Sequence, residues 1–169
     1  QNGLTQHHQN NMGTFTGPDI PTNGLVLALD ATSERSYPGS GTTWYDLSGL
    51  GNDATLINGT SWNSSGYFQT DGVDQTISIP NAASLQVTTG FTQVIWVKLN
   101  NITTVSFAQL FGKPSYLKYG MIVEWTGGNP IVFDFTNASG RNAASTTGGS
   151  GSWIMVAQSY NAAGGSNNR

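Results

Sequence analysis

Carboxylates are the side chains of this sequence that could perform catalysis, and they are sparse. Its nine acids include two glutamates, Glu34 and Glu124. Acid–base cleavage of a glycoside needs two carboxyl groups about 5 to 9.5 Å apart, yet "MIVEWTGG" has no second acid two or four residues after Glu124. Asp134, in "VFDF", could face Glu124 from a neighbouring strand. We interpret both as polar residues of a solvated sheet face, with a glycanase pair as the alternative.

Nucleophilic catalysis has less support. The two histidines, His7 and His8, lie in a polar stretch near the start of the sequence, and cysteine is absent. A serine or cysteine nucleophile needs a base that is oriented by a third group, and no such set is present. Adjacent His7 and His8 would rarely point at one metal ion. The sequence therefore predicts a protein that is not an enzyme.

Two aspartates, Asp71 and Asp74, lie close to a glycine in "FQTDGVDQTISI". An Asp-Gly pair is typical of a tight hairpin turn, because glycine adopts a positive φ and aspartate caps the turn through its side chain. We predict that both aspartates form a turn. Carboxylate oxygens also bind hard cations such as calcium, which leaves a second interpretation open.

Aromatic side chains could bind a sugar ring, since lectin sites combine an aromatic platform with a few polar groups. Trp44 and Tyr45 in "GTTWYDLSG" and Trp62 in "NGTSWNSSG" have loop-like neighbours and are the candidates for a glycan site. Trp96 and Trp153 lie in the most apolar segments, so we expect them to pack in the core.

The charge composition restricts the partners. Only 9% of the residues are charged and the net charge is −3, against roughly 25% charged residues in an average soluble domain. Such a surface exerts little attraction on nucleic acid or anionic lipid. No apolar run approaches the roughly 18 residues of a membrane span. We therefore expect neither nucleic-acid binding nor membrane insertion.

The elements that would position these residues are short strands. Residues 1–23 are polar and almost uncharged and predict an arm or linker, whereas residues 24–169 show period-two runs separated by Gly, Asn, Ser and Pro. About nine strands are expected, including "GLVLALD" and "FTQVIWVKL", the latter apolar on both faces and hence covered on both sides. "NAASLQ" could form one helical turn, and residues 137–152 form a long loop. This pattern indicates an all-β sandwich or barrel.

Several segments, in this order, resemble a known family: "GLVLALDATSERSYPGSGTTWYDLSGLGNDATLING", "YFQTDGVDQTISIP", "FTQVIWVK" and "WIMVAQSYN". Together they resemble laminin-G-like, concanavalin A-type domains, in the version found in virion structural proteins of tailed bacteriophages. The resemblance covers about residues 24–163 and implies an antiparallel two-sheet jelly-roll sandwich. Family members continue with further strands, whereas this sequence stops at "AAGGSNNR", which predicts a sandwich incomplete at its C-terminal end or completed by another subunit.

The resemblance also implies functions. It predicts a non-enzymatic virion protein, either a capsid decoration or a fibre component, that joins other virion proteins through the arm and forms a homo-oligomer. Localisation would be the virion surface, or the extracellular space for the alternative, a secreted carbohydrate-binding module that contacts a host glycan. Related sandwiches hold calcium through loop oxygens. The implied ligands here are Asp71, Asp74 and Asp46, with Asn52 or Asp53.

Overall fold

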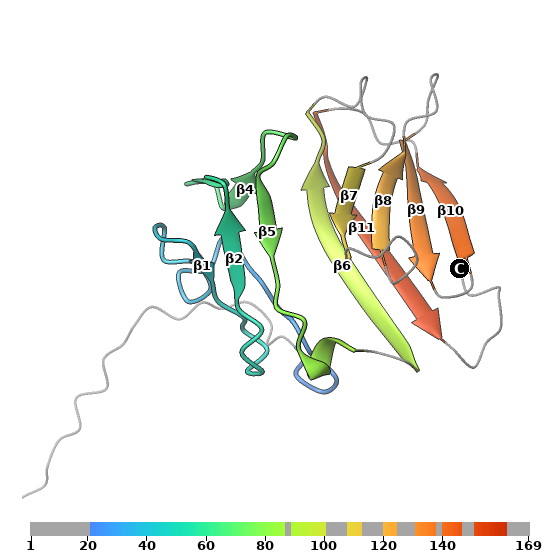
Figure 1. Ribbon diagram of the computed structural model, residues 1–169, viewed down its shortest axis with the longest axis horizontal. Helices are drawn as coiled ribbons and strands as arrows, with labels where there is room; N and C mark the ends of the chain where they lie inside the picture. The colour runs from blue at the N-terminus through green and yellow to red at the C-terminus, as the bar shows by residue number, and fades with distance from the viewer. Residues whose placement is uncertain are drawn as a thin grey trace, which may run out of the picture. The chain divides into compact units, whose positions relative to one another are not determined.

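Antiparallel strands account for nearly all regular structure in the computed structural model, which describes residues 21–86, 89–100, 108–112, 120–124, 131–137, 140–146 and 151–161 (Figure 1). The predicted all-β class is confirmed, and the single-turn helix η1 (Ala83–Leu85) lies in the predicted "NAASLQ". No helix of the described residues is long and apolar enough to cross a membrane. The predicted arm, apart from residues 21–23, lies outside the described ranges.

The chain divides into two compact units, Gln1–Gln86 and Val87–Arg169. The first unit holds β1 (Thr43–Trp44), β2 (Ala54–Ile57), β3 (Ser61–Asn63), β4 (Tyr67–Gln69) and β5 (Thr76–Ser78). The second holds β6 (Gly90–Lys98), β7 (Ala108–Phe111), β8 (Gly120–Glu124), β9 (Ile131–Asn137), β10 (Gly140–Thr146) and β11 (Trp153–Asn161).

The first unit contains two small sheets. One has the order β1-β2-β5, and the other is the β3–β4 hairpin. Along β2, Ala54 and Leu56 are buried while Thr55 between them is exposed. This alternation is what the period-two pattern of "DATLI" predicts for a strand with one face on a core.

The predicted strand over "GLVLALD" is wrong, because residues 25–30 are in no ladder in the described structure. Polar side chains, instead of a partner strand, form hydrogen bonds with the backbone of this segment. The Ala28 N–H donates to Asp46 Oδ1 (2.9 Å), and the Val26 carbonyl accepts from Asn52 Nδ2 (2.7 Å). Buried backbone groups need partners of some kind, and here two polar side chains supply them.

The predicted hairpin at Asp71 is also wrong, although the turn itself forms. Strand β4 pairs with β3 and β5 pairs with β2, so residues 70–75 connect two different sheets. Asp71 Oδ1 accepts from the Val73 N–H (2.9 Å), and Gly72 has a φ of 74°. The local chemistry of the turn was therefore predicted correctly, and the pairing of the flanking strands was not.

The second unit holds a four-stranded sheet of order β10-β9-β8-β7. The predicted long loop at residues 137–152 is wrong in its first half, because β10 pairs with β9 over seven residues, from Gly140 opposite Asn137 to Thr146 opposite Ile131. The segment "GRNAAST" is poor in the β-branched and aromatic residues that favour strands. Ladder pairing with β9 overrides that weak intrinsic preference.

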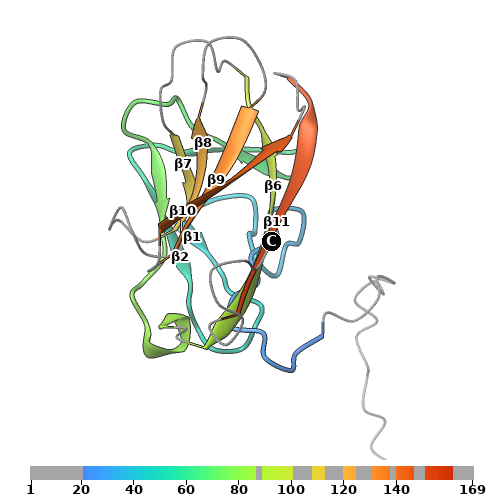
Figure 2. The same cartoon turned by 90° about the vertical axis from the view of Figure 1, so that its right-hand side faces the viewer.

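Strands β6 and β11 form a separate two-stranded ribbon of nine paired positions, and they run side by side in both views (Figures 1 and 2). Residues of the two strands alternate between more and less buried positions. On the inner face Val156 is buried, and the partly buried apolar residues packed against it come from β6, β7, β11 and the segment after β6: Ile95, Val97, Leu99, Leu110, Phe111 and Ile154.

Candidate functional site

Asp46 lies at the centre of a hydrogen-bonded loop in the first unit. Its Oδ1 accepts from the N–H groups of Ala28 and Ser48 (2.9 Å each), and its Oδ2 accepts from Ser48 Oγ (2.6 Å) and the Asn52 N–H (3.0 Å). The Asp46 N–H donates to Asp53 Oδ1 (2.8 Å). Four donors thus converge on one carboxylate and fix the loop of residues 46–53.

The pKa of Asp46 reports the same environment. Burial by itself would raise this pKa, but hydrogen bonds from the Ser48 hydroxyl and from the backbone N–H groups of Ala28, Ser48 and Asn52 outweigh burial and lower it below 3.8. Hydrogen bonds to the charged form favour that form. Asp46 is therefore a structural anion that holds the loop to residues 26–28.

Asp71 and Asp74 lie in the exposed loop between β4 and β5. The backbone N–H of Val73 is the largest of the causes that lower the pKa of Asp71, and the carbonyl of Asp74 accepts from Asn58 Nδ2 (3.1 Å). Among the described residues, no three of His, Cys, Asp or Glu gather where they could hold a metal ion. The calcium site of Asp46, Asp71 and Asp74 stays a prediction.

The aromatic residues proposed for a glycan site are placed differently from one another. Trp62 is half-buried, its ring centroid is 5.6 Å from that of Tyr37, and its Nε1 donates to the Ala31 carbonyl (3.0 Å). Trp44 is half-buried against Phe68 at 4.6 Å. Both indoles thus belong to an aromatic cluster with Tyr37 and Phe68, and packing within this cluster holds them in place.

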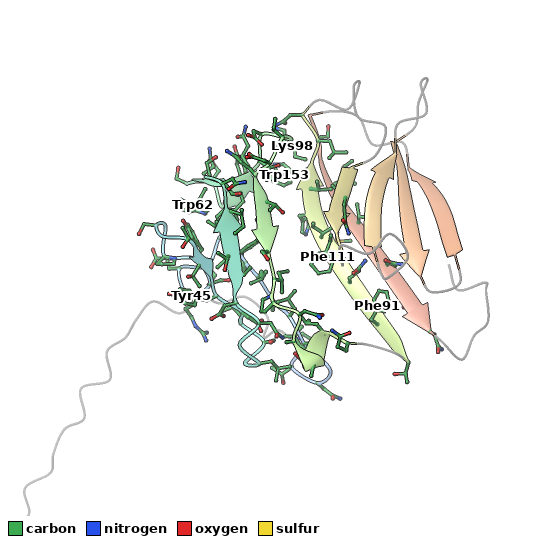
Figure 3. All side chains as sticks on the ribbon, viewed as in Figure 1. Tyr45, Trp62, Phe91, Lys98, Phe111 and Trp153 are labelled. Atoms are coloured by element: carbon green, nitrogen blue, oxygen red, sulfur yellow. The ribbon has the colours of Figure 1, made fainter. Side chains whose placement is uncertain are left out.

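Tyr45 is the exposed member of the three, with 45% of its surface accessible. Its backbone is held on both sides by Ser36: the Tyr45 N–H donates to the Ser36 carbonyl (2.7 Å), and Ser36 Oγ donates to the Tyr45 carbonyl (2.6 Å). Figure 3 shows Tyr45 and Trp62 in the first unit. Sugar binding by Trp44, Tyr45 and Trp62 stays a prediction.

The two glutamates are found in unrelated places. Glu34 is in an exposed turn of the first unit, and Glu124 ends β8. In the ladder between β8 and β9, Glu124 is opposite Val132 and Asp134 is opposite Ile122. The two acids therefore occupy neighbouring strands, as expected, at diagonal positions two residues out of register. His7 and His8 lie outside the described residues.

The sequence analysis did not predict that the outer face of the β6–β11 ribbon is exposed. Its exposed positions form four cross-strand pairs. Val94, Trp96, Trp153 and Met155 are 56%, 64%, 47% and 55% exposed. We call this face the outer strip, and its members are Thr92, Val94, Trp96, Lys98, Trp153, Met155, Ala157 and Ser159.

The expectation that Trp96 and Trp153 pack in the core is therefore wrong. The ribbon places polar side chains inside instead: Gln93 Nε2 donates to Gln158 Oε1 (2.6 Å), and Gln158 is 9% exposed. A sheet face that meets only water normally carries polar residues. The ribbon therefore shows the reverse arrangement, with Trp96, Met155 and Val94 exposed and a glutamine pair inside.

Figure 3 marks the two ends of the ribbon, with Lys98 and Trp153 toward one end of β6 and Phe91 toward the other. Apolar residues on both faces of "FTQVIWVKL" could have signalled this site, because such a strand requires a cover on each face. In the described structure β7 covers one face through Leu110 and Phe111.

Comparison of the chain with protein-family models, with curated proteins and with solved structures finds no match in any of the three.

Proposed function

We propose that this chain is a non-enzymatic contact module of a virion surface, a capsid decoration or a fibre component, and that its outer strip is the contact surface. The observation that carries the proposal is the exposure of Trp96, Met155 and Val94 on one face of the β6–β11 ribbon. The sequence resemblance to phage laminin-G-like domains supports the virion setting and the finer fold, a concanavalin A-like jelly roll.

The exposed area favours a role in contact. About 250 Å² is a generous estimate for a whole indole side chain, so exposures of 64% and 47% leave roughly 280 Å² on Trp96 and Trp153. The largest apolar patch of a monomeric protein is about 300–600 Å² and is often functional. Two residues thus nearly reach that range before Met155 and Val94 are added.

The side chains that the sequence offered for other chemistry support the same proposal. The Asp46 carboxylate is occupied by four donors of its own loop, and Trp44 and Trp62 pack in an aromatic cluster. These groups stabilise the first unit. In the outer strip, by contrast, the side chains of Val94, Trp96 and Met155 are each more than half exposed.

Incorporation into particles tests the proposal. Particles assembled with a Trp96→Lys variant should lack this protein, while the variant keeps the β-sheet circular-dichroism spectrum of the wild type. Val73→Lys is the matched control, because Val73 is 86% exposed on a loop of the first unit and should not alter incorporation. Incorporation of the Trp96→Lys variant at the wild-type level would overturn the proposal.

A carbohydrate-binding module is the second candidate, and one observation favours it. Trp96 and Trp153 are exposed at diagonal positions on one face of the ribbon, and planar aromatic side chains can stack on sugar rings. A glycan array with and without calcium, repeated with Trp96→Ala, tests this candidate. Binding that Trp96→Ala removes would favour the carbohydrate role, and an array without signals would eliminate it.

A further inference from the structure

We propose that the outer strip is a symmetric self-association site whose occupant is the outer strip of a second copy of this chain. The inference rests on the proposed function, in which the strip is a contact surface, and it adds the identity of the partner and the orientation of the contact. It is built on Thr92, Val94, Trp96, Lys98, Met155 and Ala157.

The strip has a large half and a small half. Across the ribbon Lys98 pairs with Trp153 and Trp96 pairs with Met155, whereas Val94 pairs with Ala157 and Thr92 pairs with Ser159. Side-chain volume therefore falls from one end of the ribbon to the other. Protein interfaces pack as densely as protein interiors, so the preferred partner surface is one whose volume changes in the opposite direction.

A second copy offers that surface when it is reversed. A two-fold axis that crosses the strands between the Trp96 and Val94 positions places Trp96 over Val94 of the second copy, and Met155 over Ala157 of the second copy. Each large side chain then meets a small one, twice by symmetry. A two-fold axis along the strands would instead set the two large halves against each other, with Trp96 over Met155 of the second copy.

Charge favours the same orientation. Lys98 is the only charged residue of the outer strip. The reversed arrangement places its ammonium group near the hydroxyl groups of Thr92 and Ser159 of the second copy, which can accept hydrogen bonds. The other two-fold axis would place both Lys98 ammonium groups at the same end of the interface, and like charges near each other at an interface disfavour association.

The exposed area is of the right size. A biological interface should bury about 500 Å² on each partner, and the two indoles supply roughly 280 Å² if a whole indole side chain has about 250 Å². Val94 and Met155, both more than half exposed, add to this area. The strip is large enough for a modest dimer.

Other occupants fit less well. A sugar needs hydrogen-bonding groups beside the aromatic platform, and the centre of the strip offers only Trp96, Met155, Val94 and Ala157. A strongly charged partner would meet only one charged side chain, Lys98, at one end of the outer strip. The uncharged apolar centre of the strip fits another uncharged apolar surface, such as the strip of a second copy. The chain as a whole also carries few charges that would oppose self-association.

Sedimentation of the full chain over a concentration series tests the proposal. The wild type should dimerise, and Val94→Trp should weaken the dimer about tenfold or more, because tryptophan then meets tryptophan. The double variant Val94→Trp/Trp96→Val should restore it, since large again faces small. A wild type that is monomeric throughout, or a Val94→Trp variant that dimerises as tightly as the wild type, overturns the proposal.

Cross-linking tests the orientation in a chain without native cysteine. Packed sheets are about 10 Å apart, too far for a disulfide, so a short bifunctional maleimide is the reagent. Lys98→Cys mixed with Thr92→Cys should give a covalent dimer, and each variant alone should not. A covalent dimer from Lys98→Cys alone would contradict the reversed arrangement.

The two proposals fail separately. If the chain is monomeric but Trp96→Lys still prevents incorporation into particles, the self-association proposal is wrong and the proposed function survives with another partner. If the chain dimerises through the outer strip but incorporation is unaffected by Trp96→Lys, the proposed function is wrong and self-association stands.

Discussion

Replacing Asp46 by alanine should destabilise the protein by about 3 kcal/mol at pH 7. The carboxylate accepts four hydrogen bonds, and each bond to a charged group contributes about 1.5–3 kcal/mol. The four contributions are not additive. In the variant, water can accept hydrogen bonds from the donors that lose the carboxylate, because the position is only half-buried. We therefore expect a loss of about half the smallest simple sum, which is about 6 kcal/mol for four such bonds.

The same residue predicts a dependence on pH. Because its pKa in the folded protein is below the ordinary value of 3.8, Asp46 contributes stability that is fully present above that value. This contribution is lost as the pH falls through the lowered pKa. The stability difference between the wild type and Asp46→Asn should therefore be constant from pH 7 to 5 and shrink below about pH 3.8.

Urea denaturation followed by circular dichroism measures both effects. Asp74→Ala is the control, because Asp74 is exposed and accepts a hydrogen bond from Asn58 through its backbone carbonyl, which the substitution keeps. The free energy of unfolding of this variant should stay within about 0.5 kcal/mol of the wild type. If Asp46→Ala is no less stable than Asp74→Ala, the structural role of Asp46 is refuted.

Two further substitutions test the packing of each unit. Gly66→Ala should cost about 2–3 kcal/mol of unfolding free energy, because Gly66 has a φ of 84° and a Cβ there would be 2.5 Å from Thr32 Cγ2. Gly72→Ala is the control and should cost about 1 kcal/mol, because Gly72 has a φ of 74° but open space around it. Equal losses of stability in the two variants would argue against the contact with Thr32. Gln158→Leu should cost about 1–3 kcal/mol by leaving Gln93 unpaired, whereas Gln93→Leu/Gln158→Leu should be near neutral; a double variant whose loss equals the sum of the two single losses would show that the pair is not coupled. Both are measured by urea denaturation.

Much of the strand content was predictable because alternation is a local signal. The runs at Ile77, at Val94 to Val97 and at Ile154 to Val156 all lie in strands. The failures concern segments whose structure depends on distant residues. Residues 25–30 have a period-two pattern but bond to the side chains of Asp46 and Asn52, and β10 has low intrinsic strand preference but pairs fully with β9.

The candidate site was less predictable than the strands. The types of the turn residues predicted the role of Asp71, since its side chain caps a turn with Gly72. Which face of β6 is covered is not a local property. The alternating pattern of β6 predicts that both of its faces are apolar. The register with β11 and the packing of Leu110 and Phe111 show which of the two faces is exposed.

Hydroxyl-radical footprinting of the native assembly tests the central claim most directly. Trp96 and Met155 should oxidise readily in the isolated chain and be protected in the assembly, while Tyr45, which is 45% exposed outside the strip, oxidises similarly in both. Equal oxidation of Trp96 and Met155 in the isolated chain and in the assembly would contradict the claim that the outer strip is a contact surface.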